Sequence, residues 1–269
     1  MKKYVLFLLA GTLASNVWAQ DNPTPKSPTA RKDKQAAKRE RINNLLKQEE
    51  EGEIIFSKQS AFGIKLNTDG YGLSYEIGRF KSARVANIFQ IEINEKKHKK
   101  EKRTSLLNGF NFNSVIYGKL NNFYQVKLNA GQQRIIGGKG NKNGVAVMAV
   151  YTGGLAIGLQ KPYYVDIVDK TTQQRYRKTY PEIIDSINYE EQGGSGFTVG
   201  WDKVQPKWGL SAKGALRFDY GRFNETVSAI EVGLNAEYYF GKVAQMAYSP
   251  EKSFFFNAYI SLLLGRRKS

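Results

Sequence analysis

The chain has 269 residues, a formal net charge of +17, no cysteine and a single histidine. The missing cysteines exclude disulfides and thiolate metal sites, and one histidine cannot by itself supply a zinc site, so we expect no metal and no cofactor. A mean hydropathy of −0.49 excludes a helical membrane protein but not a β-barrel, because only alternate residues of a barrel strand face lipid.

Residues 1–19 have the features of a secretory signal peptide. Lys2 and Lys3 precede an apolar run over residues 4–13, and Val17 and Ala19 occupy positions that a signal peptidase reads. The apolar run is much shorter than the roughly 20 residues that a membrane-spanning helix needs. We therefore expect cleavage before Gln20 and export of the mature chain.

The composition of residues 20–53 differs from that of the rest of the chain. Prolines open this segment, and charged residues, Gln and Ala make up most of the remainder. Such a composition favours a solvated, partly helical leader in the periplasm. The leader is either a flexible tether or a docking segment that presents a short apolar stripe, formed by Ile42, Leu45 and Leu46.

From residue 54 the pattern becomes that of β-strands. Alternating residues over 62–66 and 71–77 flank the turn Thr68-Asp69-Gly70 and predict a hairpin, and residues 89–93 continue the alternation. Further strands are predicted over 113–120, 123–132, 145–159 and 163–168, with a bend or bulge at Gly153-Gly154. These segments extend the β-domain to the middle of the chain.

The last third of the chain contains the longest alternating segments. Apolar or small residues recur at every second position over 208–220, 230–240 and 254–264. Strands of soluble proteins average about 5 to 6 residues, whereas a tilted strand needs about 9 to 11 to cross a bilayer. We predict an all-β fold over 54–269, namely a transmembrane antiparallel up-and-down β-barrel of about ten strands, with a range of 8 to 12.

The lengths of the connections indicate the orientation of the barrel. Short periplasmic turns are expected at 79–85, 120–123, 160–162 and 221–226. Long surface loops are expected at 94–110, 133–144, 169–207 and 241–252. Short turns on the periplasmic side and longer loops outside are typical of outer-membrane barrels.

The polar face of the predicted strands carries charges of both signs. A barrel this narrow has little room inside, so these charges should pair across the lumen. We expect the lumen network to consist of Glu76, Glu92, Lys127, Lys213, Arg217, Glu231 and Glu237. Lys65, Lys119 and Asp219 lie on the same face of their predicted strands.

Alternation alone does not show which face is outside, and a secreted lipocalin-like barrel or a β-sandwich has the same pattern. Strand length, loop asymmetry and the position of aromatic residues favour a lipid-facing apolar surface. Aromatic residues near strand ends form interfacial girdles in membrane barrels. The candidates are Tyr71, Tyr75, Trp208, Phe218, Tyr220, Tyr238 and Phe240.

A basic run is the strongest candidate for a surface site. It is either an anion-binding loop or a solvated hairpin tip, and it consists of Lys96, Lys97, Lys99, Lys100, Lys102 and Arg103. The single histidine, His98, lies within this run without an adjacent carboxylate to hold its tautomer, so we predict no catalytic residue. Residues 137–144 are rich in glycine but lack the ending of a nucleotide-binding loop.

The segments Gly200–Leu210 and Lys213–Phe218 carry a resemblance to a known class. Over about residues 54–265, the chain resembles small outer-membrane β-barrel proteins of Gram-negative bacteria, and among them uncharacterised barrel proteins of the Bacteroidota. It departs from their usual aromatic final residue, because Leu264 is followed by Gly-Arg-Arg-Lys-Ser. This departure bears on how the barrel is assembled.

The resemblance implies a location in the outer membrane, with the leader in the periplasm. We expect a non-enzymatic structural or partner-binding component of the cell envelope. Its partners would be outer-membrane lipid, lipopolysaccharide and envelope proteins that contact the surface loops or the leader, but not nucleic acid. The alternatives are a narrow channel or small-solute transporter and, as a third class, a barrel enzyme that acts on lipid or peptide.

Overall fold

The structure is a computed structural model that describes residues 56–82, 84–105, 114–140, 144–184, 188–221 and 225–268. These residues belong to one compact unit, Ile54–Ser269. The predicted signal peptide (1–19) and leader (20–53) lie outside the described residues. No helix in the described part of the chain is both long enough and apolar enough to cross a membrane.

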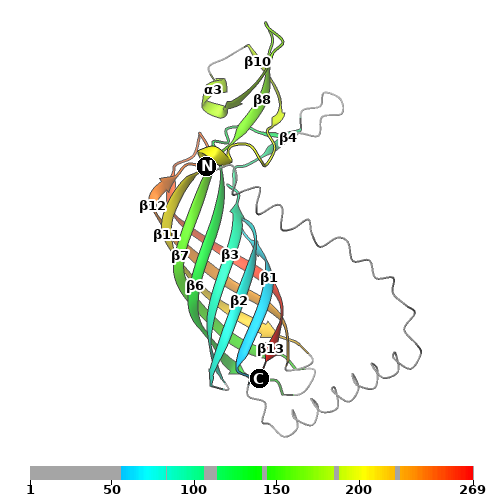
Figure 1. Ribbon diagram of the computed structural model, residues 1–269, viewed down its shortest axis with the longest axis vertical. Coiled ribbons are helices and arrows are strands. Elements are labelled where there is room, and N and C mark those ends of the chain that lie inside the picture. The colour runs from blue at the N-terminus through cyan, green and yellow to red at the C-terminus, as the bar shows by residue number, and fades with distance from the viewer. Residues whose placement is uncertain are drawn as a thin grey trace, which may run out of the picture. The chain divides into compact units, whose positions relative to one another are not determined.

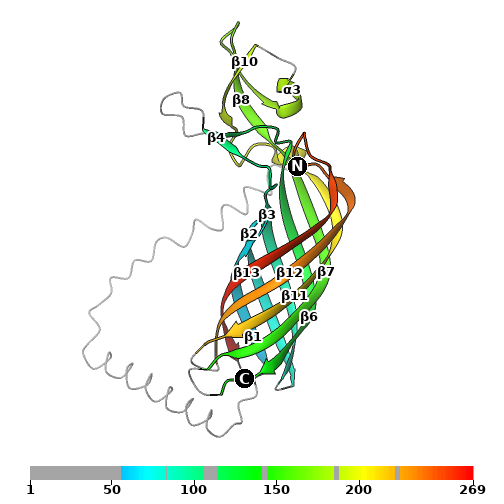
Figure 2. The same ribbon diagram turned by 180° about the vertical axis from the view of Figure 1, so that it is seen from behind.

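Eight antiparallel strands close into a barrel (Figure 1). Around the barrel their order is β1-β13-β12-β11-β7-β6-β3-β2, and ten residue pairs between β1 and β13 form the closing seam. Figure 2 shows β11, β12 and β13 from behind. The strands are β1 (Lys58–Asn67), β2 (Gly70–Ser82), β3 (Val85–Lys96), β6 (Asn121–Gly137), β7 (Ala146–Pro162), β11 (Gln205–Asp219), β12 (Thr226–Val243) and β13 (Lys252–Lys268).

The barrel has eight strands, the lower end of the predicted range of 8 to 12, because two of the ten predicted barrel strands belong to small sheets beyond one end of the barrel. The segment 113–120 contains β5 (Ser114–Ile116), which pairs with β4 (Arg103–Ser105). The segment 163–168 corresponds to β8 (Tyr164–Asp169), the central strand of a three-stranded sheet. Both strands are shorter than the about 9 residues needed to cross a bilayer, although they alternate in the same way.

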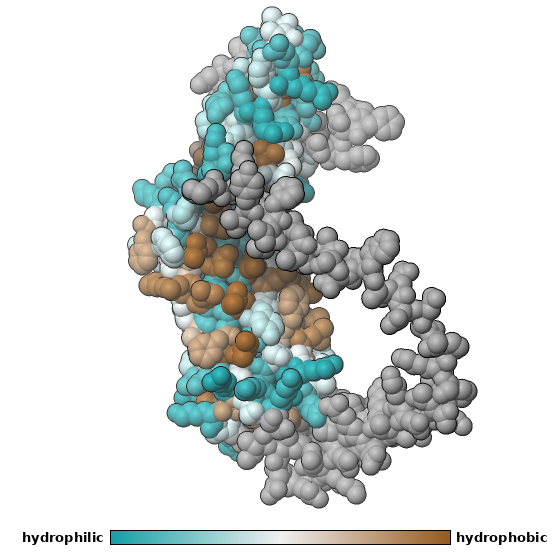
Figure 3. Space-filling model, viewed as in Figure 1, coloured by the Kyte–Doolittle hydropathy of each residue, from teal (hydrophilic) through white to brown (hydrophobic). Residues whose placement is uncertain are grey.

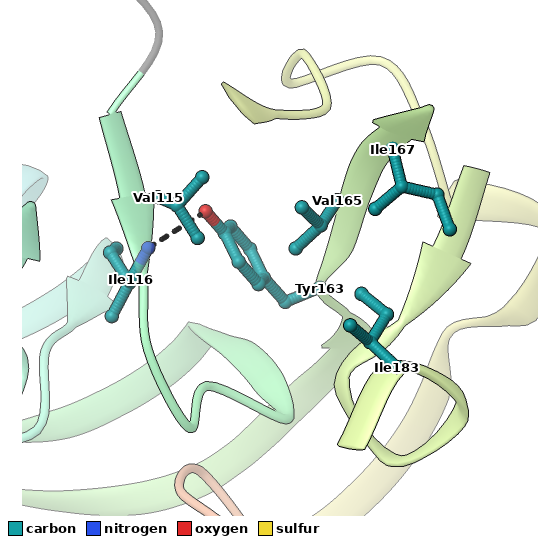
Figure 4. Packing of buried hydrophobic residues seen from close by; sticks show 6 residues of the cluster. All are labelled: Val115, Ile116, Tyr163, Val165, Ile167 and Ile183. Atoms are coloured by element: carbon teal, nitrogen blue, oxygen red, sulfur yellow. Dashed lines mark hydrogen bonds between the residues drawn. The ribbon is translucent and has the colours of Figure 1, made fainter. Parts of the chain in front are cut away.

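The two small sheets share an apolar core of their own (Figure 4). Besides β4, β5 and β8, this loop domain contains β9 (Arg175–Thr179), the helix α3 (Tyr180–Ile184) and β10 (Tyr189–Gly194), and the short 3-10 helix η1 (Trp201–Lys203) precedes β11. The backbone N–H of Ile116 donates to the hydroxyl of Tyr163 over 3.3 Å and links the two sheets. The core consists of Val115, Ile116, Tyr163, Val165, Ile167 and Ile183.

The two misassigned strands also account for errors in the predicted connections. Each barrel strand carries the chain from one end of the barrel to the other. Counting 113–120 as a barrel strand therefore assigned each following connection to the wrong end, until counting 163–168 as a second one cancelled the error. Residues 120–123 and 160–162 lie at the end that carries the long loops, where β6 begins and β7 ends. The connection between β6 and β7, predicted as the surface loop 133–144, lies at the opposite end, which we call the short-turn end. The connection predicted at 221–226 lies at the short-turn end and the one predicted at 241–252 at the loop end, as expected.

The barrel wall has an apolar outer surface and a polar interior. Large apolar side chains point outward. Between 39% and 56% of the surface is exposed in Phe62, Ile64, Leu73, Ile91, Leu155, Ile230 and Leu262. Figure 3 shows a brown band of hydrophobic residues across the wall, with hydrophilic surface on either side. This arrangement is the reverse of a soluble barrel, in which the apolar face is buried.

The register between β6 and β7 depends on a glycine. β7 pairs with β6 and β11 without a register shift at Gly153 or Gly154, so the predicted bulge is absent there. A Cβ atom on Gly154 would collide with the backbone carbonyl of Leu128, whereas one on Gly153 would meet only the Ser211 carbonyl at 3.6 Å. Gly154 therefore permits the close approach of two neighbouring strands.

We expect Gly154→Ala to lower the free energy of unfolding by about 1–3 kcal/mol, because the backbone of β6 or β7 must move to accommodate the methyl group. Urea titration of the refolded protein measures this change. Gly153→Ala is the matched control and should change stability much less. Equal effects of the two substitutions would contradict the register between β6 and β7.

Candidate functional site: the charge-filled lumen

The inward face of the barrel carries charged side chains that are almost completely shielded from solvent. None of the seven residues predicted for the lumen network is more than 5% exposed. Strand alternation places them there, because each lies an even number of residues from its inward neighbours on the same strand. The structure brings these predicted residues together with Lys65, Asp69 and Lys96, which complete a set of five carboxylates and five cations.

Arg217 lies at the centre of one group of ion pairs. Its Nη1 and Nη2 atoms donate to the two carboxylate oxygens of Glu76, each over 2.6 Å. Its Nε and Nη2 atoms donate to Oε2 of Glu231 over 2.9 Å and 2.6 Å, and Nη1 also donates to Gln133 over 2.9 Å. Arg217 is on β11 and Glu76 on β2, which are opposite each other in the ring of eight strands. This ion pair therefore crosses the lumen.

Glu92 forms the centre of a second group. Its Oε1 atom accepts from Lys65 over 2.6 Å and lies 3.4 Å from Nζ of Lys213, while Lys127 Nζ lies 3.7 Å from its Oε2. Lys213 also reaches Glu231 at 3.4 Å and donates to Gln90. Lys213 thus connects the two groups of ion pairs into one continuous network.

Lys96 lies inside the lumen near the loop end. Its predicted place in the basic surface loop is therefore wrong. Its Nζ atom lies 2.6 Å from Asp69 and 2.9 Å from Glu237, and the side chain is buried. Lys127 also pairs with Glu237. β3 continues its alternation from Glu92 through Asn94, so the parity of the sequence already placed Lys96 inside. β3 and β12 are also opposite strands, and this contact is a second bridge across the lumen.

Two further features fill the ends of the lumen. Near the loop end, the ring of Phe123 stacks on Phe255 with a centroid distance of 5.6 Å and meets Tyr239 edge-on at 5.3 Å. At the short-turn end, Asp219 pairs with Arg267 of the last strand.

Lys119, predicted on the inward face, belongs instead to the loop domain and pairs with Glu101 at 2.7 Å. Burial lowers the pKa of Lys119 from its ordinary value.

The charges in the lumen are balanced in sign and paired. Each buried charge lies against an opposite one, which offsets the large desolvation cost of burying it. Balanced signs also remove the single-sign field that would attract one kind of ion. Within the described ranges, no cluster of three or more His, Asp or Glu side chains could hold a metal ion.

The remaining residues of the basic run lie outside the barrel. Lys99, Lys100, Lys102 and Arg103 are exposed and Lys97 is half-buried. The Nδ1 atom of His98 accepts a hydrogen bond from the backbone N–H of Lys100 over 3.2 Å. Burial lowers the pKa of His98 below its ordinary value of 6.5, and the charges of Lys252 and Lys100 lower it further. The imidazole is therefore neutral at pH 7 and bonded within its own loop.

We expect Arg217→Ala to lower the free energy of unfolding by about 3–5 kcal/mol, because it leaves Glu76 and Glu231 buried without their guanidinium partner. Lys99→Ala, which removes an exposed cation, should change it by about 0–1 kcal/mol. Urea unfolding of the refolded barrel compares the two. Small and equal effects would show that the inward face is solvated.

The imidazole of His98 should titrate below pH 6.5, as followed by the resonances of the single histidine in an NMR titration. Because the folded pKa lies below the unfolded one, this contribution to stability is present above pH 6.5 and is lost as the pH falls through the folded pKa. His98→Gln should abolish that part of the pH dependence. A midpoint above 6.5 would exclude this environment.

No protein-family model matches the sequence, and no curated protein matches it. Solved structures to which the chain is similar include Neisserial surface protein A, at 8% identity and a TM-score of 0.38, covering 78% of this chain and 95% of that one. The N-terminal β-barrel domain of Pseudomonas aeruginosa OprF shares 12% identity at a TM-score of 0.36, covering 78% and 98%. Ail of Yersinia pestis shares 11% identity at a TM-score of 0.35, covering 78% and 96%.

Proposed function

We propose that the protein is a non-enzymatic outer-membrane β-barrel whose lumen is closed by paired charges and which acts as a structural or partner-binding component of the cell envelope. The ion pair between Arg217 and Glu76 carries this proposal. It joins opposite strands of the barrel through two 2.6 Å hydrogen bonds, where a conducting pore would need open space. We also propose that the protein is similar to barrel proteins of the Bacteroidota, on the basis of the segments Gly200–Leu210 and Lys213–Phe218.

The apolar outer wall supports a membrane location. Soluble monomers rarely expose contiguous apolar patches larger than a few hundred Å². Here the exposed apolar residues recur on strand after strand, and Ile64 is 52%, Leu155 56% and Leu234 50% exposed. A bilayer covers such a band, and a closed barrel leaves no sheet edge unpaired within it.

The asymmetry of the two ends supports an orientation. Both the first and the last strand of the barrel have their outer ends at the short-turn end, as expected for an even number of strands. This end would face the periplasm, with the leader attached to it, and the loop domain would lie outside. The loop domain has its own apolar core, so it can present a folded surface to lipopolysaccharide or to another envelope protein.

The surroundings of His98 support a non-enzymatic role. A general base needs a free nitrogen and usually a group that orients the ring. The Nδ1 atom of His98 is engaged by the Lys100 backbone, and cations rather than a carboxylate dominate the effect of neighbouring charges on its pKa. These contacts favour a structural loop over a hydrolytic centre.

Insertion and conductance test the proposal together. The full chain, refolded into vesicles, should migrate differently on gels before and after heating, and in planar bilayers it should give no steady open steps. Arg177→Gln, which alters an exposed pair with Asp166 at 2.9 Å, serves as the control for Arg217→Gln, which alters a buried pair. Steady steps of the wild type that change with Arg217→Gln but not with Arg177→Gln would establish a channel instead. Recovery as a soluble periplasmic protein would refute the membrane location.

A further inference from the structure

Three cations form a lateral row on the outer wall at the short-turn end. Lys58 of β1 is paired in register with Lys268 of β13 on one side and with Arg79 of β2 on the other. The backbone N–H of Ser57 donates to the Lys268 carbonyl over 2.9 Å, and that of Phe80 donates to the Ser57 carbonyl over 3.0 Å. The sheet therefore holds the three side chains next to one another, with neighbouring strands about 4.8 Å apart.

Like charges directly opposite each other destabilise a sheet, so an anionic partner would stabilise this row. All three side chains are exposed. In the part of the chain that the structure describes, no carboxylate forms an ion pair with any of them. Arg267, between Arg266 and Lys268 on the same strand, points inward and pairs with Asp219. The inward cation at this end thus has a carboxylate partner, whereas among the described residues the outward row has none.

The row lies beside the apolar band of the same three strands. One step toward the loop end, a second row contains Arg266, Ser60 and Ile77, and the next contains Leu264, Phe62 and Tyr75. Each step of two residues advances about 7 Å along a strand. Ile77, Leu264, Phe62 and Tyr75 are all exposed large hydrophobic residues, between 46% and 54%. The change from apolar to cationic wall therefore occurs within the depth at which lipid phosphates lie beside a hydrocarbon core.

We propose that the outer wall of β13, β1 and β2 at the short-turn end binds the phosphate groups of anionic glycerophospholipids, through Lys58, Arg79 and Lys268, with Arg266 in the adjacent row. The cations are close enough for one phosphate to contact two of them, and charge-assisted hydrogen bonds to phosphate suit both Lys and Arg. The orientation assigns these lipids to the periplasmic leaflet. This inference rests on the proposed membrane-spanning function.

Spin-labelled lipids test the site directly. The full chain is reconstituted in phosphatidylcholine vesicles that contain a trace of spin-labelled phosphatidylglycerol or phosphatidylcholine, and the motionally restricted fraction gives the relative association constant. We expect the wild type to prefer phosphatidylglycerol by at least about five-fold, which corresponds to one basic residue beside an anionic lipid surface. The triple variant Lys58→Gln, Arg79→Gln, Lys268→Gln should lose most of this preference.

A second triple variant, Lys99→Gln, Lys100→Gln, Lys102→Gln, removes the same charge from the loop and should keep the preference. Equal association of both lipids with the wild type, or an equal loss in both triple variants, would overturn the proposed site. If the first triple variant does not refold, Arg79→Gln against Lys99→Gln makes the same comparison. Absence of any restricted lipid together with failure to insert would refute the membrane-spanning function itself, and so is distinguishable from failure of the lipid site.

Discussion

The bridge between Arg217 and Glu76 connects strands that the sheet does not connect. Hydrogen bonds of a barrel join each strand only to its two neighbours, so the cross-section of a ring of eight could flatten without breaking a backbone bond. Side chains that meet in the middle fix the distance between opposite walls. Lys96 and Glu237 do the same nearer the loops, at 2.9 Å. The shape of the wall, and hence the spacing of everything mounted on it, depends on these contacts.

The same contacts explain how a chain with so many charged residues can have an apolar exterior. Every second residue of a strand points inward, and the interior of a narrow barrel is filled by those side chains. Charges placed there are kept off the outer wall and are compensated by one another, with Lys213 joining Glu92 and Glu231 at 3.4 Å each. The low overall hydropathy is therefore the result of a polar core and polar loops around an apolar wall.

Sequence alternation predicted the two faces of the wall and the inward direction of most of the charged residues that meet in the lumen, because side-chain direction in a strand follows parity. Asp69 had instead been assigned to a turn and Lys96 to the surface loop. Alternation could not distinguish a barrel strand from a strand of the loop domain. Residues 163–168 alternate as a barrel strand does, but their apolar face packs on Ile183 and Val115 rather than forming part of the exposed outer wall. Alternation also could not predict which charges pair, because pairing depends on which strands lie opposite each other in the barrel. Arg217 and Glu76, for example, are 141 residues apart in the sequence.

The seam between β1 and β13 joins the first strand of the barrel to the last, through pairs such as Phe62 with Leu264 and Lys65 with Ser261. Arg267, the inward partner of Asp219, is contributed by the same last strand. Until that strand is in place, the sheet has two open edges, and the carboxylate of Asp219 lacks this cation. An exposed edge pairs readily with other chains, so an unclosed sheet is open to such pairing until β13 is in place. Sealing the wall and completing the charge balance at the short-turn end therefore depend on the same strand.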